Sequence, residues 1–347
     1  WLKACKRQIH DPSRRWKHLS LMSEEEPWCR HLSPADHVQC VAICGGTHGD
    51  ERNGVYLGRE FAKRQGPVGG DDGFELVVVE TNVEATKANR RYVEEDLNRC
   101  FTCKDLDDQT LTLYEQRRAK EINQLLGPKT SPTPKADFVL DLHNTTAATG
   151  VALFLHPRDK FAMGLAAFLQ SIDPTVQVAL WANRDVMLLP SVGRSGMTFE
   201  VGPVSIKCLD AKLYAQSKLL IEASLRYFTA HNCARKRSVD GEVVGERRRQ
   251  SLRCFQMIRA VPFPRDYDKE LLGMIHPTVD GKDFTALKGS DPVFSMFDGS
   301  EKTLQDMIEV TDDEVYPYLI NEASYYEKDT AFLIGRRVEY DVEVLVM

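Results

Sequence analysis

A histidine and a glutamate stand three residues apart where a short apolar run gives way to a pair of glycines. Residues 45–51 read GGTHGDE and follow residues 38–44, whose apolar character is typical of a buried strand. His48 and Glu51, at positions i and i+3, face the same side of a turn that enters a helix. A zinc site that leaves one position open for water uses three protein ligands, so this pair predicts part of such a site.

A second histidine could supply the missing ligand. His143 lies in the motif DLHNTT, at the end of another predicted buried strand at residues 137–142. In open α/β sheets, ligands bind at the carboxyl ends of the strands, which is where both histidine motifs fall. The same residues also fit two unrelated loop histidines, because an HxxE spacing is short and common.

Two further segments carry groups that could bind or activate a substrate. Arg91 and the sequence DLNR, which ends in Asn98 and Arg99, place two guanidinium groups and an amide in one stretch. The planar fork of arginine binds a carboxylate through two hydrogen bonds and can stabilise a developing oxyanion, although surface charges near helix ends look the same in a sequence. Glu200 lies in an apolar run at residues 197–201, where an acid is either a paired structural group or a general base.

The elements that must position these groups alternate along the first two thirds of the chain. Strands are expected at six apolar runs, and helices at four stretches with helical periodicity. Such alternation predicts a mostly parallel sheet that is covered on both faces. The predicted strands are 38–44, 74–79, 137–142, 151–156, 176–181 and 197–201, and the predicted helices are 53–64, 114–126, 161–171 and 211–229.

The character of the sequence changes after residue 229. Residues 231–253 are polar and basic, with RKR at 235–237 and RRR at 247–249, and we expect a solvated, mobile loop there. Beyond it, short strands broken by proline and glycine predict a second, β-rich domain, and the final VEYDVEVLV is typical of an edge strand. The predicted division is an unstructured or extraneous extension at 1–37, a domain with the predicted zinc site at 38–232, a basic linker insertion at 233–253 and a β-rich domain at 254–347.

Composition excludes several classes of protein. The 347 residues carry 45 basic and 51 acidic side chains, and a net charge of −6 disfavours a general nucleic-acid binder. Hydrophobic residues make up 42% and charged residues 28%, which excludes wholesale disorder. No run approaches the roughly 18 apolar residues of a membrane span, although a peripheral association with a membrane stays open. Nine cysteines without regular spacing indicate buried thiols in a reducing compartment, so we expect a cytoplasmic protein.

The beginning of the chain does not resemble a targeting segment. It starts with Trp1, and its first methionine is Met22. Residues 1–37 have neither the apolar centre of a signal peptide nor the acid-poor composition of a transit peptide. We therefore expect translation to start at Met22, with residues 1–21 as an upstream extension.

Together, the motifs resemble those of the aspartoacylase/aminoacylase-3 family of zinc amidohydrolases, whose fold is related to that of the zinc carboxypeptidases. The resemblance runs from about residue 38 to about residue 332 and is carried by GGTHGDE, RYVEEDLNR, LLGPK, DFVLDLHNTT, EVGP, PFPRD, IHP, DPVF and VYPYLINEASYYEK. It implies an α/β fold, with a three-layer αβα sheet domain of the zinc-carboxypeptidase kind and a smaller β-rich C-terminal domain. It also implies one Zn2+ per chain, a small-molecule N-acyl amino acid substrate, and a homodimer or homotetramer.

The resemblance assigns a role to each candidate residue. His48, Glu51 and His143 would hold the zinc ion, and Glu200 would be the general base that takes a proton from the attacking water. The remaining candidates would hold the substrate: Arg91 at the scissile carbonyl, Asn98 and Arg99 at the α-carboxylate, Tyr325 closing over the substrate, and Glu322 as a supporting partner in the C-terminal domain.

One position separates two branches of this family. Aspartoacylases carry an arginine about ten residues before the catalytic glutamate, where it binds the aspartate side chain, and this chain has Pro190 there. The sequence therefore looks more like aminoacylase-3, which predicts hydrolysis of N-acetyl aromatic amino acids and mercapturic acids in an apolar pocket. Arg184 or Arg194 could replace the missing arginine, and the chain would then be an aspartoacylase acting on N-acetylaspartate. A non-catalytic zinc-binding scaffold is the alternative from a different class.

Overall fold

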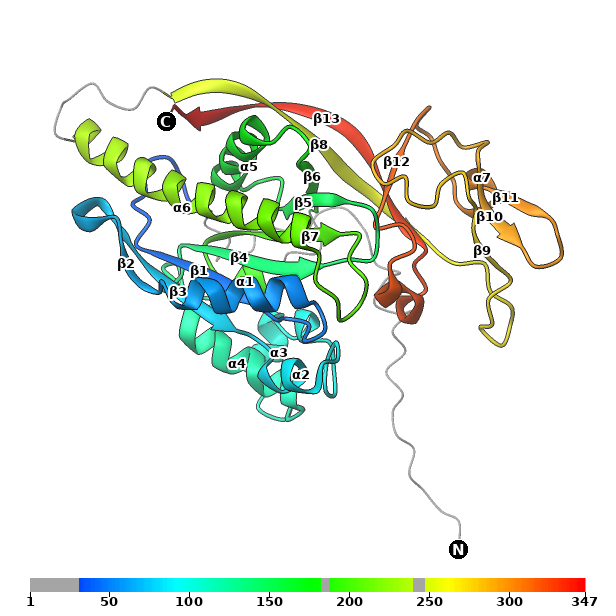
Figure 1. Ribbon diagram of the computed structural model, residues 1–347, viewed down its shortest axis with the longest axis horizontal. Helices are drawn as coiled ribbons and strands as arrows, with labels where there is room; N and C mark the ends of the chain where they lie inside the picture. The colour runs from blue at the N-terminus through cyan, green and yellow to red at the C-terminus, as the bar shows by residue number, and fades with distance from the viewer. Residues whose placement is uncertain (1–30, 182–186, 240–246, 347) are drawn as a thin grey trace, which may run out of the picture.

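The computed structural model describes residues 31–181, 187–239 and 247–346. Its centre is a ten-stranded sheet in the order β12-β13-β8-β6-β5-β7-β4-β1-β3-β2 (Figure 1). Among the described strands of this sheet, five of the nine neighbouring pairs are parallel, so the sheet is mixed where a mostly parallel one was predicted. Its strands are β1 (Cys40–Gly45), β2 (Gly66–Val68), β3 (Phe74–Glu80), β4 (Phe138–Asn144), β5 (Gly150–Leu155), β6 (Gln177–Leu180), β7 (Ser195–Gly202), β8 (Arg247–Val261), β12 (Tyr316–Tyr318) and β13 (Phe332–Leu345).

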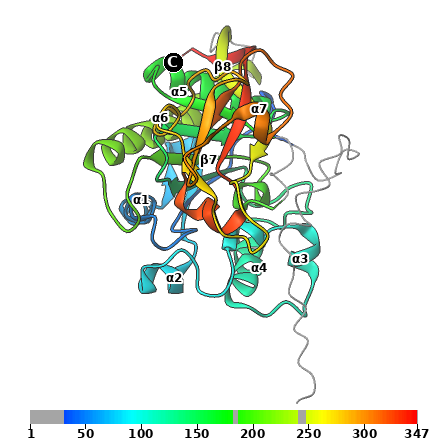
Figure 2. The same cartoon turned by 90° about the vertical axis from the view of Figure 1, so that its right-hand side faces the viewer.

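Helices cover the sheet on both faces. Alternation along β1 sends Val41 and Ile43 into one core with α1, α5 and α6, and Cys40, Ala42 and Cys44 into another core with α4. In Figure 2, α1, α5 and α6 lie to the left of the sheet and α3 and α4 to its lower right. The helices are α1 (Arg52–Ala62), α2 (Val83–Ala88), α3 (Cys103–Asp107), α4 (Tyr114–Leu126), α5 (Lys160–Ile172), α6 (Ala211–Val239) and α7 (Leu304–Met307).

The basic segment after residue 229 is built differently from the prediction. A mobile loop was expected at 231–253, but α6 continues to Val239 and β8 begins at Arg247. The strand forms because Leu252 and Cys254 are fully buried, while Arg249 of the same strand faces outward and forms a 3.0 Å ion pair with Asp341 of β13. Residues 240–246 lie outside the described part of the chain.

Two long strands connect the central sheet to a smaller β-rich part. β8 and β13 pair antiparallel from Arg247 opposite Leu345 to Val261 opposite Phe332, where only short strands were predicted. Figure 1 shows this ribbon leading from the sheet to the small part. That part has its own hydrophobic core and a three-stranded sheet of β9 (Gly273–Ile275), β10 (Pro292–Met296) and β11 (Glu301–Thr303).

The last residues of the predicted N-terminal extension pack against the fold. The Leu32 amide donates to Ser195 Oγ (3.0 Å), and His231 of α6 lies 2.8 Å from the Asp36 carbonyl oxygen. Residues 31–37 are therefore held by distant parts of the chain, which local sequence patterns do not reveal. Residues 1–30, with the expected extension 1–21, lie outside the described part. No helix within the described residues is long and apolar enough to cross a membrane.

Candidate active site

The register of two neighbouring strands brings His143 and Glu200 together. β4 and β7 run parallel, and His143 is paired directly with Glu200. Leu142 and Phe199, one position earlier on each strand, face the core beneath α1, α5 and α6. Because side chains alternate along a strand, His143 and Glu200 project from the opposite face.

The turn between β1 and α1 carries His48 and Glu51. It is pressed against α2 so closely that a Cβ on Gly49 would lie 2.1 Å from a backbone carbon of Ala85, which only glycine avoids. The Gly49 amide donates to the Arg91 carbonyl oxygen at 3.2 Å, which fixes the turn to the next loop. Glu51 then enters α1 as its N-cap residue, with its side chain directed back toward His48.

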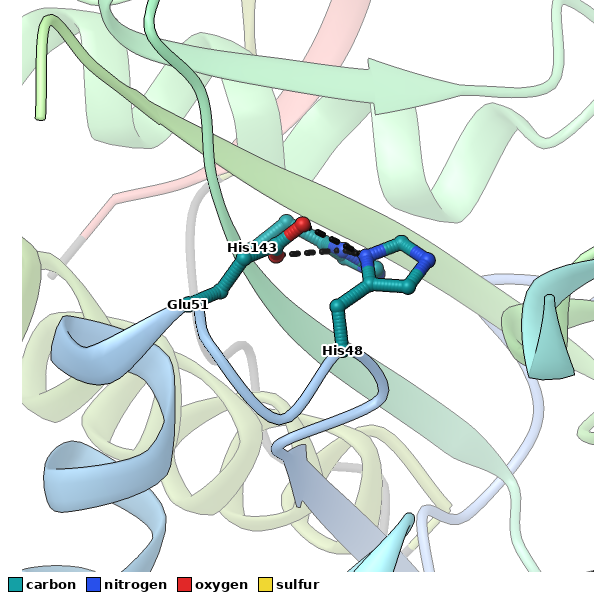
Figure 3. A group of neighbouring side chains, drawn as sticks. All are labelled: His48, Glu51 and His143. Atoms are coloured by element: carbon teal, nitrogen blue, oxygen red, sulfur yellow. Dashed lines mark hydrogen bonds and ion pairs between the residues drawn. The ribbon is translucent and has the colours of Figure 1, made fainter. Parts of the chain in front are cut away.

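The three predicted zinc ligands converge. One donor atom from each of His48, Glu51 and His143 lies within 4.8 Å of the others, and all three residues are buried. His48 Nδ1 is 2.5 Å from Glu51 Oε1, His143 Nδ1 is 2.9 Å from Glu51 Oε2, and the two Nδ1 atoms are 3.1 Å apart. Figure 3 shows the two rings and the carboxylate pointing toward one another.

The opposite ring nitrogens show that this cluster fits a metal ion. His48 Nε2 lies 2.9 Å from Asp96 Oδ1, and His143 Nε2 lies 2.7 Å from Asp141 Oδ2. The Thr47 hydroxyl donates to the other oxygen of Asp141 at 2.7 Å. When Nε2 donates to a carboxylate, the lone pair of Nδ1 is left to face the centre, which is the usual arrangement of zinc-binding histidines. Two imidazole nitrogens and one carboxylate form a donor set that zinc accepts, with a position left for water.

Glu51 and Glu200 differ in the direction in which their pKa values are shifted. Burial alone would raise the pKa of Glu51, but the imidazoles of His48 and His143 hold it well below its usual range. Burial raises the pKa of Glu200 to about 8, although His143 opposes this effect. A carboxyl group whose pKa lies near neutrality suits a general base, whereas a carboxylate that stays ionised suits a metal ligand.

The predicted substrate-binding residues line one pocket together with the metal cluster and Glu200. The side chain of Asn98, however, already has a hydrogen-bond partner within the protein. Its Oδ1 accepts a hydrogen bond from the Leu189 amide (2.9 Å), and its Nδ2 lies 3.4 Å from His143 Nε2. The oxygen of the Asn98 side chain is therefore engaged within the protein. Arg91 donates from Nη1 to Glu51 Oε1 at 3.0 Å. The residues that line the pocket are His48, Glu51, Arg91, Asn98, Arg99, Asn144, Thr145, Phe154, Trp181, Leu188, Thr198, Glu200, Leu319, Glu322, Ser324 and Tyr325.

The C-terminal part reaches into this pocket. Glu322 accepts hydrogen bonds from the Thr146 amide (2.7 Å) and from the Thr145 hydroxyl, both just beyond β4. Tyr325, in the 3₁₀ helix η5 (Ala323–Lys328), is only 6% exposed and lines the pocket. The segment that follows β12 thus closes one side of the site.

An aromatic wall forms another side, and sequence reasoning missed it. The rings of Phe154 and Trp181 stack at 4.4 Å with 25° between their planes, and Trp181 Nε1 donates to the Tyr318 hydroxyl at 3.0 Å. Leu188 and Leu319 lie beside them in the pocket lining. Phe154 and Trp181 lie at the ends of two predicted strands, so their approach to the site could be inferred only after the strand order was known.

The position that separates the two family branches does not face the pocket. Pro190 is buried in the 3₁₀ helix η4 (Leu189–Val192), where a Cβ on Gly196 would lie 2.9 Å from its side chain. Arg194 comes just before β7 and pairs with Asp36 at 2.8 Å. It therefore lies at the start of the strand, whereas Glu200 lies near the other end. Arg194 is therefore not a substitute for the missing arginine. Arg184 lies outside the described residues.

Residues 37–228 match the catalytic domain of succinylglutamate desuccinylase/aspartoacylase, and residues 250–337 match the AstE/AspA barrel-sandwich hybrid domain. The chain belongs to the succinylglutamate desuccinylase/aspartoacylase family. The resemblance inferred from the motifs is confirmed, and so is the α/β fold with its smaller C-terminal domain. As a member of this family the protein is a hydrolase that acts on carbon–nitrogen bonds.

Relatives named as aminoacylases and relatives named as aspartoacylases are both similar to the chain over most of its length. The human N-acyl-aromatic-L-amino acid amidohydrolase (carboxylate-forming) is 35% identical over 324 residues, which cover 91% of this chain and 96% of the relative. A probable aspartoacylase of Trichodesmium erythraeum is 33% identical over 302 residues, covering 86% and 97%. The crystal structure of murine aminoacylase 3 superimposes with a TM-score of 0.79 at 33% identity, covering 90% of this chain and 99% of that one.

Proposed function

We propose that the protein is a zinc-dependent amidohydrolase that releases acetate and the free amino acid from N-acetyl amino acids with aromatic side chains, and from mercapturic acids. The observation that carries the proposal is the placement of Glu200 beside the cluster of His48, Glu51 and His143 in a pocket that also holds arginines. A metal, a base and cations are the groups that a metal-dependent hydrolysis of an amide uses.

Four residues of the pocket, besides the metal cluster, have distinct parts in this reaction. Zinc, when bound by the cluster, would polarise the scissile carbonyl and make water more acidic. Glu200 takes a proton from the attacking water and returns it to the leaving amine. Arg91, whose Nη1 is now engaged by Glu51, turns to the developing oxyanion, and Arg99 binds the substrate α-carboxylate. Tyr325 excludes water from the side that faces the C-terminal part.

The aromatic wall supports the choice of side chain. Phe154 and Trp181 offer stacked rings to a substrate ring, a contact worth about 0.5–1.5 kcal/mol beyond burial. The second candidate is hydrolysis of N-acetylaspartate, which the names of several relatives favour. Among the described residues that line the pocket, the cations are Arg91 and Arg99, which are assigned to the carbonyl and the α-carboxylate, so an aspartate side chain would lack a cation of its own.

A comparison of two substrates tests the proposal. The purified full chain, loaded with zinc, should have a kcat/KM for N-acetyltyrosine at least about tenfold above that for N-acetylaspartate, equivalent to about 1.4 kcal/mol. A preference for N-acetylaspartate would replace the aminoacylase proposal with the aspartoacylase one. Absence of zinc from the active protein, measured by elemental analysis, would overturn the assignment of the metal.

A cytoplasmic location and a homodimer or homotetramer remain predictions from the sequence. Light scattering of the purified protein measures the oligomeric state, and fractionation of the source cells measures the location.

A further inference from the structure

A lysine of the C-terminal part reaches the metal cluster through a single carboxylate. Lys328 is the last residue of η5, and its Nζ lies 2.8 Å from Asp96 Oδ2. Asp96 Oδ1 lies 2.9 Å from His48 Nε2 and also accepts a hydrogen bond from the backbone amide of Asn98 at 3.1 Å. The three side chains form a continuous hydrogen-bonded path from η5 to a proposed zinc ligand.

This path is largely shielded from water. The side chains of Lys328, Asp96 and His48 are 17%, 9% and 4% exposed. Burial lowers the pKa of Lys328 to about 7, and the Asp96 carboxylate opposes that effect. Because Lys328 and Asp96 pair at 2.8 Å in this shielded position, each charge depends on the other, and a buried charge that loses its partner is costly.

A competing cation lies close to the same oxygen. Arg91 Nη2 is 3.6 Å from Asp96 Oδ2, and its Nη1 already donates to Glu51. With Lys328 in place, Asp96 is held at 2.8 Å by the lysine and keeps its other oxygen on His48. Without Lys328, Arg91 would be one neighbouring cation available to Oδ2, and a shift of the carboxylate toward it would draw Asp96 away from the His48 ring.

We propose that Lys328 is a positioning residue of the metal centre: its ammonium group fixes Asp96, so that Asp96 holds the His48 ring with Nδ1 directed at the ion. The zinc cluster is then complete only when η5 is docked. This inference rests on the proposed zinc site, and it assigns to the C-terminal part a role in metal binding besides its role in closing the pocket.

The test compares metal affinity in variants of the full chain. Lys328→Met keeps most of the length of the side chain and removes its charge, and it should weaken zinc binding about 10–100-fold in competition with a chelator, as is typical when a supporting partner of a zinc ligand is lost. Lys328→Arg keeps the charge and should recover most of that affinity. In Co2+-substituted protein, the visible absorption bands should change in the Met variant and return in the Arg variant.

A neighbouring contact provides the matched control. The Tyr92 hydroxyl donates to Glu327 Oε2 at 3.1 Å, so Glu327→Gln weakens a contact between the same two segments without touching Asp96. This variant should bind zinc as the unmutated protein does. An equal loss of affinity in Glu327→Gln and Lys328→Met would show that docking of the segment in general, and not Lys328, is what matters, and would overturn the inference.

A double substitution tests the path itself. Asp96→Asn should weaken zinc binding to a similar extent, and Lys328→Met added to it should cost at most about twofold more, because both changes break the same path. Independent, multiplicative losses would overturn the inference, and so would a Met variant that binds zinc normally or an Arg variant that binds no better than the Met variant. If the unmutated protein binds no zinc, the proposed function fails instead.

Discussion

Lowering the pH should destabilise the protein through one buried histidine. His231 of α6 is fully buried; its Nε2 lies 2.8 Å from the Asp36 carbonyl oxygen, and its Nδ1 lies 3.2 Å from Arg247 Nη2. The neutral ring satisfies both contacts, because Nε2 donates to the carbonyl and Nδ1 accepts from the guanidinium. A second proton would sit on Nδ1, directly against Arg247.

The magnitude follows from the shift in pKa. Burial lowers the pKa of His231 to about 4, from 6.5 in the unfolded chain, while the Asp36 carbonyl oxygen opposes this and Arg247 adds to it. Between these values the unfolded chain binds more protons than the folded one, so the free energy of unfolding falls as the pH decreases from 6.5 toward 4. A difference of about 2.5 pH units at 1.36 kcal/mol each gives a loss of about 3 kcal/mol, with the full contribution present above pH 6.5.

Urea unfolding between pH 4.5 and 7.5 measures this effect. His231→Gln keeps a donor for the Asp36 carbonyl oxygen but does not titrate, so its stability should depend less on pH than that of the unmutated protein. Identical slopes for the unmutated protein and His231→Gln would refute the reasoning.

Three substitutions test other parts of the molecule. Glu200→Gln should lower kcat about 10²–10⁴-fold with zinc content unchanged, because Glu200 is not among the three clustered donors; an unmutated zinc protein without turnover on any acyl amino acid would favour the scaffold alternative. Tyr318→Phe removes the hydroxyl that accepts from Trp181, so kcat/KM for N-acetyltyrosine should fall about 2–10-fold and that for N-acetylalanine should not; equal losses would disprove a role in reading the side chain. Gly49→Ala forces a Cβ against the α2 backbone, so it should lower the free energy of unfolding by about 1–3 kcal/mol and should weaken zinc binding. Gly289→Ala, where the added Cβ would be 3.6 Å from its nearest neighbour, should change neither. Normal zinc binding in Gly49→Ala would contradict the argument.

Local patterns predicted most of the elements because local chemistry determines them. The helix expected at 114–126 matches α4, which stops at Gly127, and the six predicted strands correspond to β1 and β3–β7. The end of α6 was missed because its last turns are stabilised by distant contacts, such as the hydrogen bond from the Val38 amide to Asn232 Oδ1. Helical residues held by contacts 194 positions away carry no local signal.

The candidate site divides in the same way. His48 and Glu51 belong to one turn, and His143 ends a recognisable strand, so their types and spacing were sufficient to pick them out. Asp141 could also have been found, because it stands two residues before His143 and therefore on the same face of β4. The pairing of Lys328 with Asp96, 232 residues apart, depends on how η5 docks, which no spacing in the sequence encodes.

The position of β8 determines how the chain can be divided experimentally. β8 is hydrogen-bonded to β6 on one side and to β13 on the other, and α5 packs on both long strands. A fragment cut before Arg247 would leave β6 as an open edge and would strip α5 of the surface that it covers. Unprotected edges of this kind recruit strands from other molecules. A fragment that ends before Arg247 should consequently aggregate when it is expressed alone, and should not be a soluble catalytic half.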